Sequence, residues 1–201
     1  LDKQPGSLAP ETESLMEACL TNLHVLCQTA RETGIPVLLD AEQSYRQPAL
    51  DYVAMRMMRE HNVRGERPVI YNTYQMYLEN ALGRVHRDIA AAVEGEFTFA
   101  AKVVRGAYLV TETERAREEG YPVPLHPSKQ ATDEAYNAAI GAILRQIHAD
   151  PDTAAVVVAT HNRDSVLQAA TTMDQLGLAR DHPRIATAQI MGMCENITIG
   201  V

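Results

Sequence analysis

The sequence predicts an α/β protein built around a parallel β-sheet. Short apolar runs typical of buried strands alternate with stretches in which apolar residues recur at helical spacing, and these runs are near-continuously apolar. A chain of 201 residues with 46% hydrophobic composition can bury the core of one globular domain, and no low-complexity linker divides it.

The first half of the chain predicts three helix–strand units. In the first helix the apolar positions are Leu15, Cys19, Leu23, Leu26 and Ala30, and we expect it to end at Gly34, before a strand in "IPVLLD" (35–40). The second helix covers residues 46–62, with a proline near its start, and precedes the strand "RPVIYN" (67–72). The third has its apolar stripe at 78–93 and precedes "FTFAAKVVRG" (97–106).

The second half begins irregularly and then returns to the same pattern. Residues 111–120 predict a charged helix with a solvated face, although with the proline-rich segment 121–127 it could also form a lid. Helical stripes at 136–147 and 166–176 then alternate with the strands "AAVVVATHN" (154–162) and "RIATAQIMG" (184–192).

Composition excludes several classes of function. The net charge is −8 and no basic run is present, so we expect no nucleic-acid partner. No apolar run approaches the roughly 18 residues of a membrane span. Three cysteines without a CxxC pair predict a reducing compartment rather than disulfides, with Cys19 and Cys27 facing a helix core. Carboxylates and histidines never occur at a ligand spacing such as HExxH, so we expect no metal site. The serine elbow GxSxG and the phosphate-binding loop motifs are also absent.

Two architectures fit this pattern, a doubly wound sheet and an eight-unit barrel, which typically needs about 250 residues. In both, ligands bind beyond the carboxyl ends of the strands. Every predicted strand has polar residues at that end: Asp40, Glu42 and Gln43; Asn72, Tyr74 and Gln75; Lys102 and Arg105; Thr160, His161 and Asn162; Gln189.

Lys102 is the most unusual of these residues because it lies within the apolar strand "FAAKVV". A buried ammonium is costly unless an anion or a ligand faces it. Lys102 therefore either pairs with a core carboxylate such as Asp40 or Glu42, or contacts a ligand. His161 is equally open to two interpretations, a ligand contact or a core histidine, and Asn162 is a candidate helix N-cap.

Five segments together resemble the flavin-dependent proline dehydrogenases, in particular the eukaryotic proline and hydroxyproline dehydrogenase branch. They are "LLDAEQSYRQPALD", "YNTYQMYL", "AKVVRGAYL" with its following "TE", "ATHNRDSV" and "AQIMGMCENI". The resemblance covers about residues 35–198, in one order along the chain. It implies that residues 1–201 form a single partial barrel domain of the (βα)8 TIM-barrel type, incomplete, with about five units.

The resemblance further implies FAD as cofactor, proline or hydroxyproline as substrate, and a mitochondrial location. Hydride would pass from the carbon beside the substrate nitrogen to flavin N5, giving 1-pyrroline-5-carboxylate, and electrons would then pass to a quinone. It assigns catalytic positions to Asp40 and Lys102. Lys102 would also lie near flavin N5, and further cofactor contacts would come from Ala41, Gln75, Arg105, Gly106, Ala107, Thr160, His161 and Gln189.

The family pattern also has a strand lysine before residue 35, and an arginine pair with a glutamate after residue 198, that this chain lacks. We therefore expect a truncated fragment, and an inert one that binds no flavin is one alternative. Another is a Schiff-base aldolase that uses Lys102 as its nucleophile.

Overall fold

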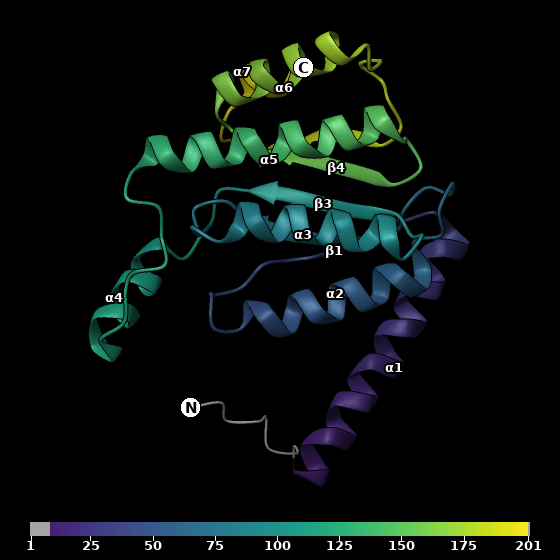
Figure 1. Ribbon diagram of the computed structural model, residues 1–201, viewed down its shortest axis with the longest axis vertical. Helices are drawn as coiled ribbons and strands as arrows, with labels where there is room; N and C mark the ends of the chain where they lie inside the picture. The colour runs from purple at the N-terminus through teal and green to yellow at the C-terminus, as the bar shows by residue number, and fades with distance from the viewer. Residues whose placement is uncertain (1–8, 201) are drawn as a thin grey trace.

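The computed structural model describes residues 9–200, and its centre is one parallel sheet in the order β1-β2-β3-β4-β5 (Figure 1). The strands are β1 Val37–Leu39, β2 Ile70–Gln75, β3 Phe99–Val104, β4 Ala154–Ala159 and β5 Ile185–Ala188. The helices are α1 Pro10–Thr33, α2 Gln47–His61, α3 Ala81–Glu94, α4 Leu109–Glu119, α5 Lys129–Ala149, α6 Arg163–Leu176 and α7 Glu195–Thr198. Residues 1–8 and 201 of the expected domain lie outside the described residues.

The strand order decides between the two architectures. Each strand lies beside the strand that precedes it, and all four pairs are parallel. A doubly wound sheet would reverse its order at a switch point and carry helices on both faces. Here α2, α3 and α5 run side by side over one face (Figure 1), as right-handed crossovers in a barrel require. The barrel-type fold is confirmed, and within residues 9–200 the sheet is open at β1 and β5.

The main core lies between the sheet and its helices. Strand residues such as Phe99 and Val156 pack there against Met57 of α2 and Ile143 of α5, all of them buried. Because side chains alternate along a strand, the next residue in each strand faces the opposite side. That side holds a smaller cluster, formed by Tyr71, Ala100 and Ala155 with the partly buried Val157. In the register Lys102 lies between Thr73 and Val157, so it belongs to this second face.

Helix α1 departs from its predicted packing. Leu15 is 70% exposed and Leu26 56%, and of the predicted stripe only Ala30 is buried. Figure 1 shows the reason, since the amino-terminal part of α1 extends away from the sheet. The expectation that Cys19 faces a core is therefore wrong, because this thiol is exposed, whereas for Cys27 the expectation is confirmed.

Two smaller differences concern single elements. The second strand is predicted to end at residue 72, whereas β2 continues through Gln75, and all six of its residues are buried between the neighbouring strands. Its polar Asn72 is hydrogen-bonded, donating to Asp51 over 3.0 Å. Helix α7 has four residues, too few to show a periodicity in the sequence. In residues 9–200, no helix is long and apolar enough to cross a membrane.

Asn62 joins the end of α2 to the amino-terminal ends of two strands. Its Oδ1 accepts hydrogen bonds from the backbone N–H groups of Val69 and Ile70, at 3.0 and 2.9 Å. Its Nδ2 donates to the carbonyl oxygens of Ile70 and Thr98, at 2.7 and 3.1 Å. The side chain is 1% exposed, so water cannot replace these bonds.

We predict that Asn62→Ala lowers the free energy of unfolding by about 2–4 kcal/mol, because it leaves several buried backbone groups without partners. Urea unfolding would measure the loss. Asn22→Ala is the matched control, since Asn22 is exposed on α1 and alanine favours a helix. Equal stability of the two variants would contradict the role given to Asn62.

Candidate functional site

The carboxyl ends of the strands meet along one edge of the sheet. Gln75 is the last residue of β2, Lys102 lies near the end of β3, and the last residues of β4 and β5 pair with one another as Ala159 and Ala188. Ligand sites in barrels lie at this edge. The structure brings to it all the residues predicted for the site: Asp40, Ala41, Gln75, Lys102, Arg105, Gly106, Ala107, Thr160, His161 and Gln189.

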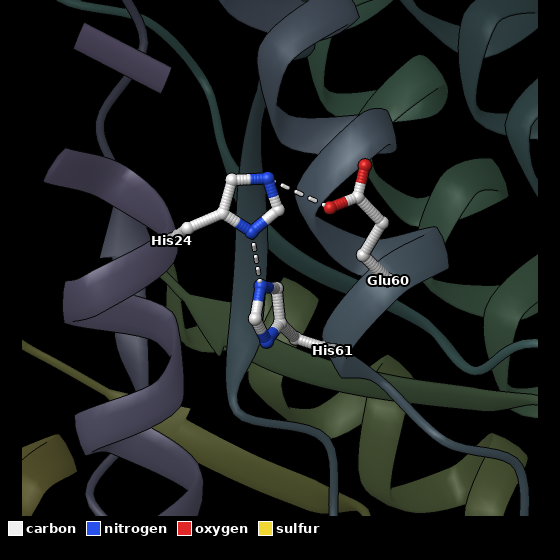
Figure 2. Close-up of side chains that lie close together, drawn as sticks. All are labelled: His24, Glu60 and His61. Atoms are coloured by element: carbon white, nitrogen blue, oxygen red, sulfur yellow. Dashed lines mark hydrogen bonds and ion pairs between the residues drawn. The ribbon is translucent and has the colours of Figure 1, made fainter. Parts of the chain in front are cut away.

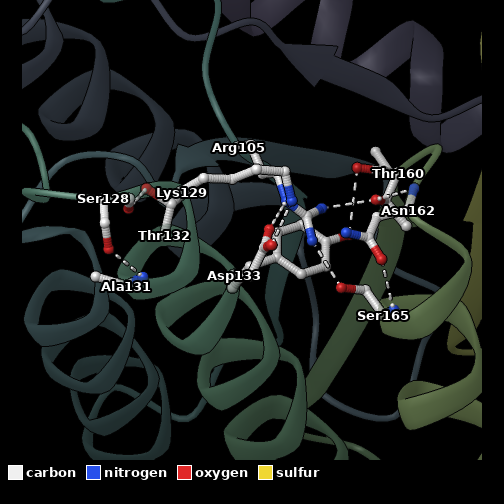
Figure 3. Close-up of polar contacts among 11 residues, drawn as sticks. Arg105, Ser128, Lys129, Ala131, Thr132, Asp133, Thr160, Asn162 and Ser165 are labelled. Carbon is white, nitrogen blue, oxygen red and sulfur yellow. Dashed lines mark hydrogen bonds and ion pairs between the residues drawn. The ribbon is translucent and has the colours of Figure 1, made fainter.

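Arg105 connects three segments at this edge (Figure 3). Its Nε donates to Asp133 Oδ1 over 2.6 Å, Nη1 to Thr160 Oγ1 over 2.7 Å and Nη2 to Ser165 Oγ over 2.6 Å. The guanidinium also lies 4.2 Å from the ring centroid of Tyr136. Arg105 thus holds the end of β3 against α5, the end of β4 and the first turn of α6.

The groups around Arg105 are matched to its charge. Burial alone would raise the pKa of the Asp133 carboxyl, but hydrogen bonds from Lys129 and Arg105 outweigh this effect, so the pKa lies below its usual value. Burial raises the pKa of the Tyr136 phenol against the opposing influence of Arg105. At neutral pH Asp133 is therefore an anion and Tyr136 an uncharged ring that faces the guanidinium.

The segment after β4 forms a second set of contacts. Thr160 Oγ1 also accepts from the backbone N–H of Asn162 over 3.0 Å, and Asn162 Oδ1 accepts from the backbone N–H of Ser165 over 3.1 Å. The N-cap interpretation of Asn162 is confirmed. His161 Nε2 accepts from the backbone N–H of Ile190 over 2.9 Å, which leaves the proton of the neutral ring on Nδ1.

Gln75 holds two loops together. Its Nε2 donates to the carbonyl of Glu42 over 2.7 Å, in the loop after β1, and its Oε1 accepts from the backbone N–H of Ala107 over 3.3 Å. The side chain is 3% exposed. Ala41 lies beside Glu42 in the first loop, so three predicted cofactor contacts, Ala41, Gln75 and Ala107, converge here.

Lys102 forms an ion pair with Asp40 across the open face of the sheet. The lysine side chain is 20% exposed, whereas the Asp40 side chain is 80% exposed. The pairing with Asp40 that the structural interpretation of Lys102 expected is present, but Asp40 is not a core carboxylate. The ammonium is thus held at the rim of the sheet, where a bound molecule can reach it.

Gly106 is required by the protein itself. Its φ of 138° is rarely adopted by residues with side chains. A Cβ at this position would lie 2.2 Å from the ring of Tyr77. The approach that demands glycine is therefore that of Tyr77, and the cofactor contact that the resemblance implies for Gly106 stays a prediction. The adjacent Arg105 carbonyl accepts the backbone N–H of Tyr77 over 2.7 Å, which keeps the ring in place.

Helix α4 is also fastened to the site. Glu112 is 1% exposed and accepts hydrogen bonds from the backbone N–H and the hydroxyl of Ser44, at 2.5 and 2.6 Å. The expected solvated face of this helix is therefore interrupted at Glu112, and the lid interpretation stays a prediction. Burial, with the nearby Glu112 carboxylate, raises the pKa of Tyr77 to about 12, so this phenol stays protonated.

Gln189 leaves a polar group unused. Within residues 9–200, its Nε2 is buried without a hydrogen-bond partner, a costly state for an amide nitrogen. Sequence reasoning found Gln189 but missed Asp133, Ser165 and Glu112. The available signal was that all three lie in the early turns of helices that follow the strand ends.

The chain is similar in sequence to one family of known enzymes. The family model for proline dehydrogenase matches residues 3–201. The chain is 39% identical to mitochondrial proline dehydrogenase 1 of Homo sapiens over 97% of its own length and 33% of the human protein. It is 35% identical to hydroxyproline dehydrogenase of Bos taurus over 100% of its length and 43% of the bovine protein. It thus spans about a third of the first and under half of the second.

The fold also has a close structural counterpart. Proline utilization A from Bdellovibrio bacteriovorus, in a crystal structure of the protein inactivated by N-propargylglycine, superposes with a TM-score of 0.80 at 22% identity. The match covers 90% of this chain and 18% of the bacterial one. At this identity the likeness shows a shared fold.

We predict that Gly106→Ala lowers the free energy of unfolding by about 2 kcal/mol or more, because the new methyl overlaps the Tyr77 ring and the backbone is strained. Gly83→Ala is the control: Gly83 lies within α3 with open space around it, so alanine should stabilise by about 0.5–1 kcal/mol. Thermal or urea unfolding compares the two. Similar effects at both glycines would contradict the role of Tyr77.

Proposed function

The chain belongs to the proline dehydrogenase family, and we propose that it forms part of an FAD-dependent enzyme that oxidises L-proline, or hydroxyproline, at the carbon beside the ring nitrogen. With proline the product is 1-pyrroline-5-carboxylate. When bound, the flavin supplies a hydride acceptor at N5 and passes the electrons to a quinone. Residues 1–201 would form one partial barrel domain of this enzyme, and the names of several relatives support a mitochondrial location.

The donors at the strand ends fit a cofactor that carries phosphates and hydrogen-bond acceptors. Arg105 uses one N–H on each of its nitrogens within the protein, and each terminal nitrogen keeps one further N–H for a phosphate oxygen. His161 has its Nδ1 proton, and the orphaned Nε2 of Gln189 has two N–H donors. Gly106 and Ala107 would add backbone contacts beside them.

The position of Lys102 carries the proposal. It is a cation on the open face of the sheet, at the carboxyl edge and held by the exposed Asp40. From there it would stabilise the negative charge that develops on the flavin ring during hydride transfer. Asp40 would orient the ammonium and lie at the substrate, and Gln75, fixed between two loops, would present its amide to the ring.

The ion pair between Lys102 and Asp40 does not favour the aldolase alternative. A Schiff-base aldolase needs an uncharged lysine amine as its nucleophile, but Lys102 faces a carboxylate, so the structure gives this alternative no support. Relatives of both substrate types have comparable identity to this chain, 39% and 35%, so proline and hydroxyproline remain alternative substrates. The other alternative is an inert chain that binds no flavin, and the flavin content of the purified protein tests it.

We predict that L-proline or hydroxyproline bleaches the visible flavin absorbance of the full-length protein under anaerobic conditions. Lys102→Met should slow this reduction by about 100-fold, as expected for the loss of one preorganised charge at the reacting atoms. Lys102→Arg should retain most of the rate because it keeps the charge.

Arg180→Met is the control for loss of a positive charge, since Arg180 is 84% exposed and lies before β5, on the side of the sheet opposite the site residues. The Arg180→Met variant should reduce its flavin at the wild-type rate. Absence of flavin from the purified wild-type protein, or a flavin that neither substrate reduces, would refute the proposed function. An undiminished rate in Lys102→Met would refute only the role of Lys102.

A further inference from the structure

Three side chains that commonly bind metals meet where α1 packs on the end of α2. His24 comes from α1, and Glu60 and His61 are the last two residues of α2 (Figure 2). His24 Nδ1 lies 3.0 Å from His61 Nε2, and His24 Nε2 lies 2.8 Å from Glu60 Oε2. One potential ligand atom from each residue lies within 4.8 Å of the other two.

We propose that His24, Glu60 and His61 bind a divalent transition-metal ion, Zn²⁺ being the best match, which fastens α1 to α2. Two imidazoles and one carboxylate are a ligand set that zinc uses. Two nitrogens that are each about 2.0 Å from a tetrahedral zinc are about 3.3 Å apart, close to the 3.0 Å between the two histidines. To bind one ion, both rings must turn so that their lone pairs face it, and the Glu60 carboxylate, which now contacts His24 Nε2, must turn toward the same point.

The cluster is accessible to solvent and leaves room for a further ligand. Glu60 and His61 line a cavity of about 620 Å³, together with two further acidic residues, Glu32 and Glu66, and two basic ones, Arg31 and Arg67. The His24 and Glu60 side chains are 36% and 35% exposed. Cys27 does not belong to this group of ligand atoms. Water is then the natural fourth ligand.

Some of the charged groups around the cluster favour a bound cation and others oppose it. Arg56 donates to Glu60 Oε1 over 3.2 Å and leaves Oε2 directed at His24. Arg31 lines the same cavity as His61 and its charge opposes a cation, but it is itself paired with Glu66.

The position of the cluster separates it from the candidate flavin site. The end of α2 leads into Asn62, which binds the amino-terminal ends of β2 and β3, whereas the flavin donors lie at the carboxyl ends. In barrels that amino-terminal side serves stability. Helix α1 is also largely exposed, with Cys27 and Ala30 buried in the core and Leu20 and Leu23 partly buried against it. A metal would therefore add a strong link to a weakly packed helix.

Metal binding can be tested on the full-length protein without a histidine tag. After chelator treatment and dialysis, titration with ZnCl₂ should show one tight site, and CoCl₂ should give the visible absorption of a coordinated ion. His24→Ala and His61→Ala should each weaken zinc binding by about tenfold or more, and the double variant should take up no stoichiometric zinc. His148→Ala, an exposed histidine on α5, should bind as the wild type does.

The same titration reads out stability. Zinc should raise the melting temperature of the wild type and His148→Ala but not of the double variant. A wild-type protein that takes up no zinc, or equal zinc uptake by the wild type and the double variant, would overturn the proposal. In that case the three residues form only a hydrogen-bonded chain between the helices. Flavin content plays no part in either readout, so the result stands apart from the proposed function.

Discussion

The guanidinium of Arg105 determines how the carboxyl edge of the sheet is organised. It binds a carboxylate on α5, a hydroxyl after β4 and a hydroxyl in the first turn of α6, and it lies over the ring of Tyr136. Thr160, which receives one of these bonds, in turn accepts the N–H of the residue that caps α6. The strand ends are therefore fixed by the protein before any ligand binds, and preorganised donors of this kind need no rearrangement to stabilise charge.

The two ends of the strands serve different purposes. Because the strands are parallel and follow chain order, all residues after the strands gather at one edge and all residues before them at the other. The carboxyl edge holds exposed or incompletely satisfied polar groups, including the Lys102–Asp40 pair and the orphaned amide of Gln189. The opposite edge holds Asn62, whose hydrogen-bonding groups are all used, and the His24 cluster. Within residues 9–200, the amino-terminal edge also has one buried nitrogen without a partner, Nη1 of Arg184. In barrels the carboxyl edge is the one that binds ligands, as the proposed function requires here.

Sequence periodicity predicted the strands and the principal helices because apolar spacing reports burial directly. It failed for Cys19, since periodicity indicates that a helix has an apolar face but not how far along that face another element reaches. It could not reveal the partners of Arg105, because Asp133 and Ser165 are 28 and 60 residues away. The reason for Gly106 was equally hidden, since it depends on where the Tyr77 ring packs. The His24 cluster escaped motif spacing because its two histidines come from different helices.

We expect the flavin to bind at the carboxyl edge of this sheet. Amide hydrogen exchange on the full-length protein, with and without bound FAD, tests it most directly, because slowed exchange maps the segments that a ligand orders. We expect bound FAD to slow amide exchange in residues 40–44, 75–77, 104–107, 160–162 and 188–190. Protection confined to the groove between α2 and α3, a cavity of about 950 Å³ bordered by Arg56 and Arg84, or to the amino-terminal ends of the strands, would contradict it.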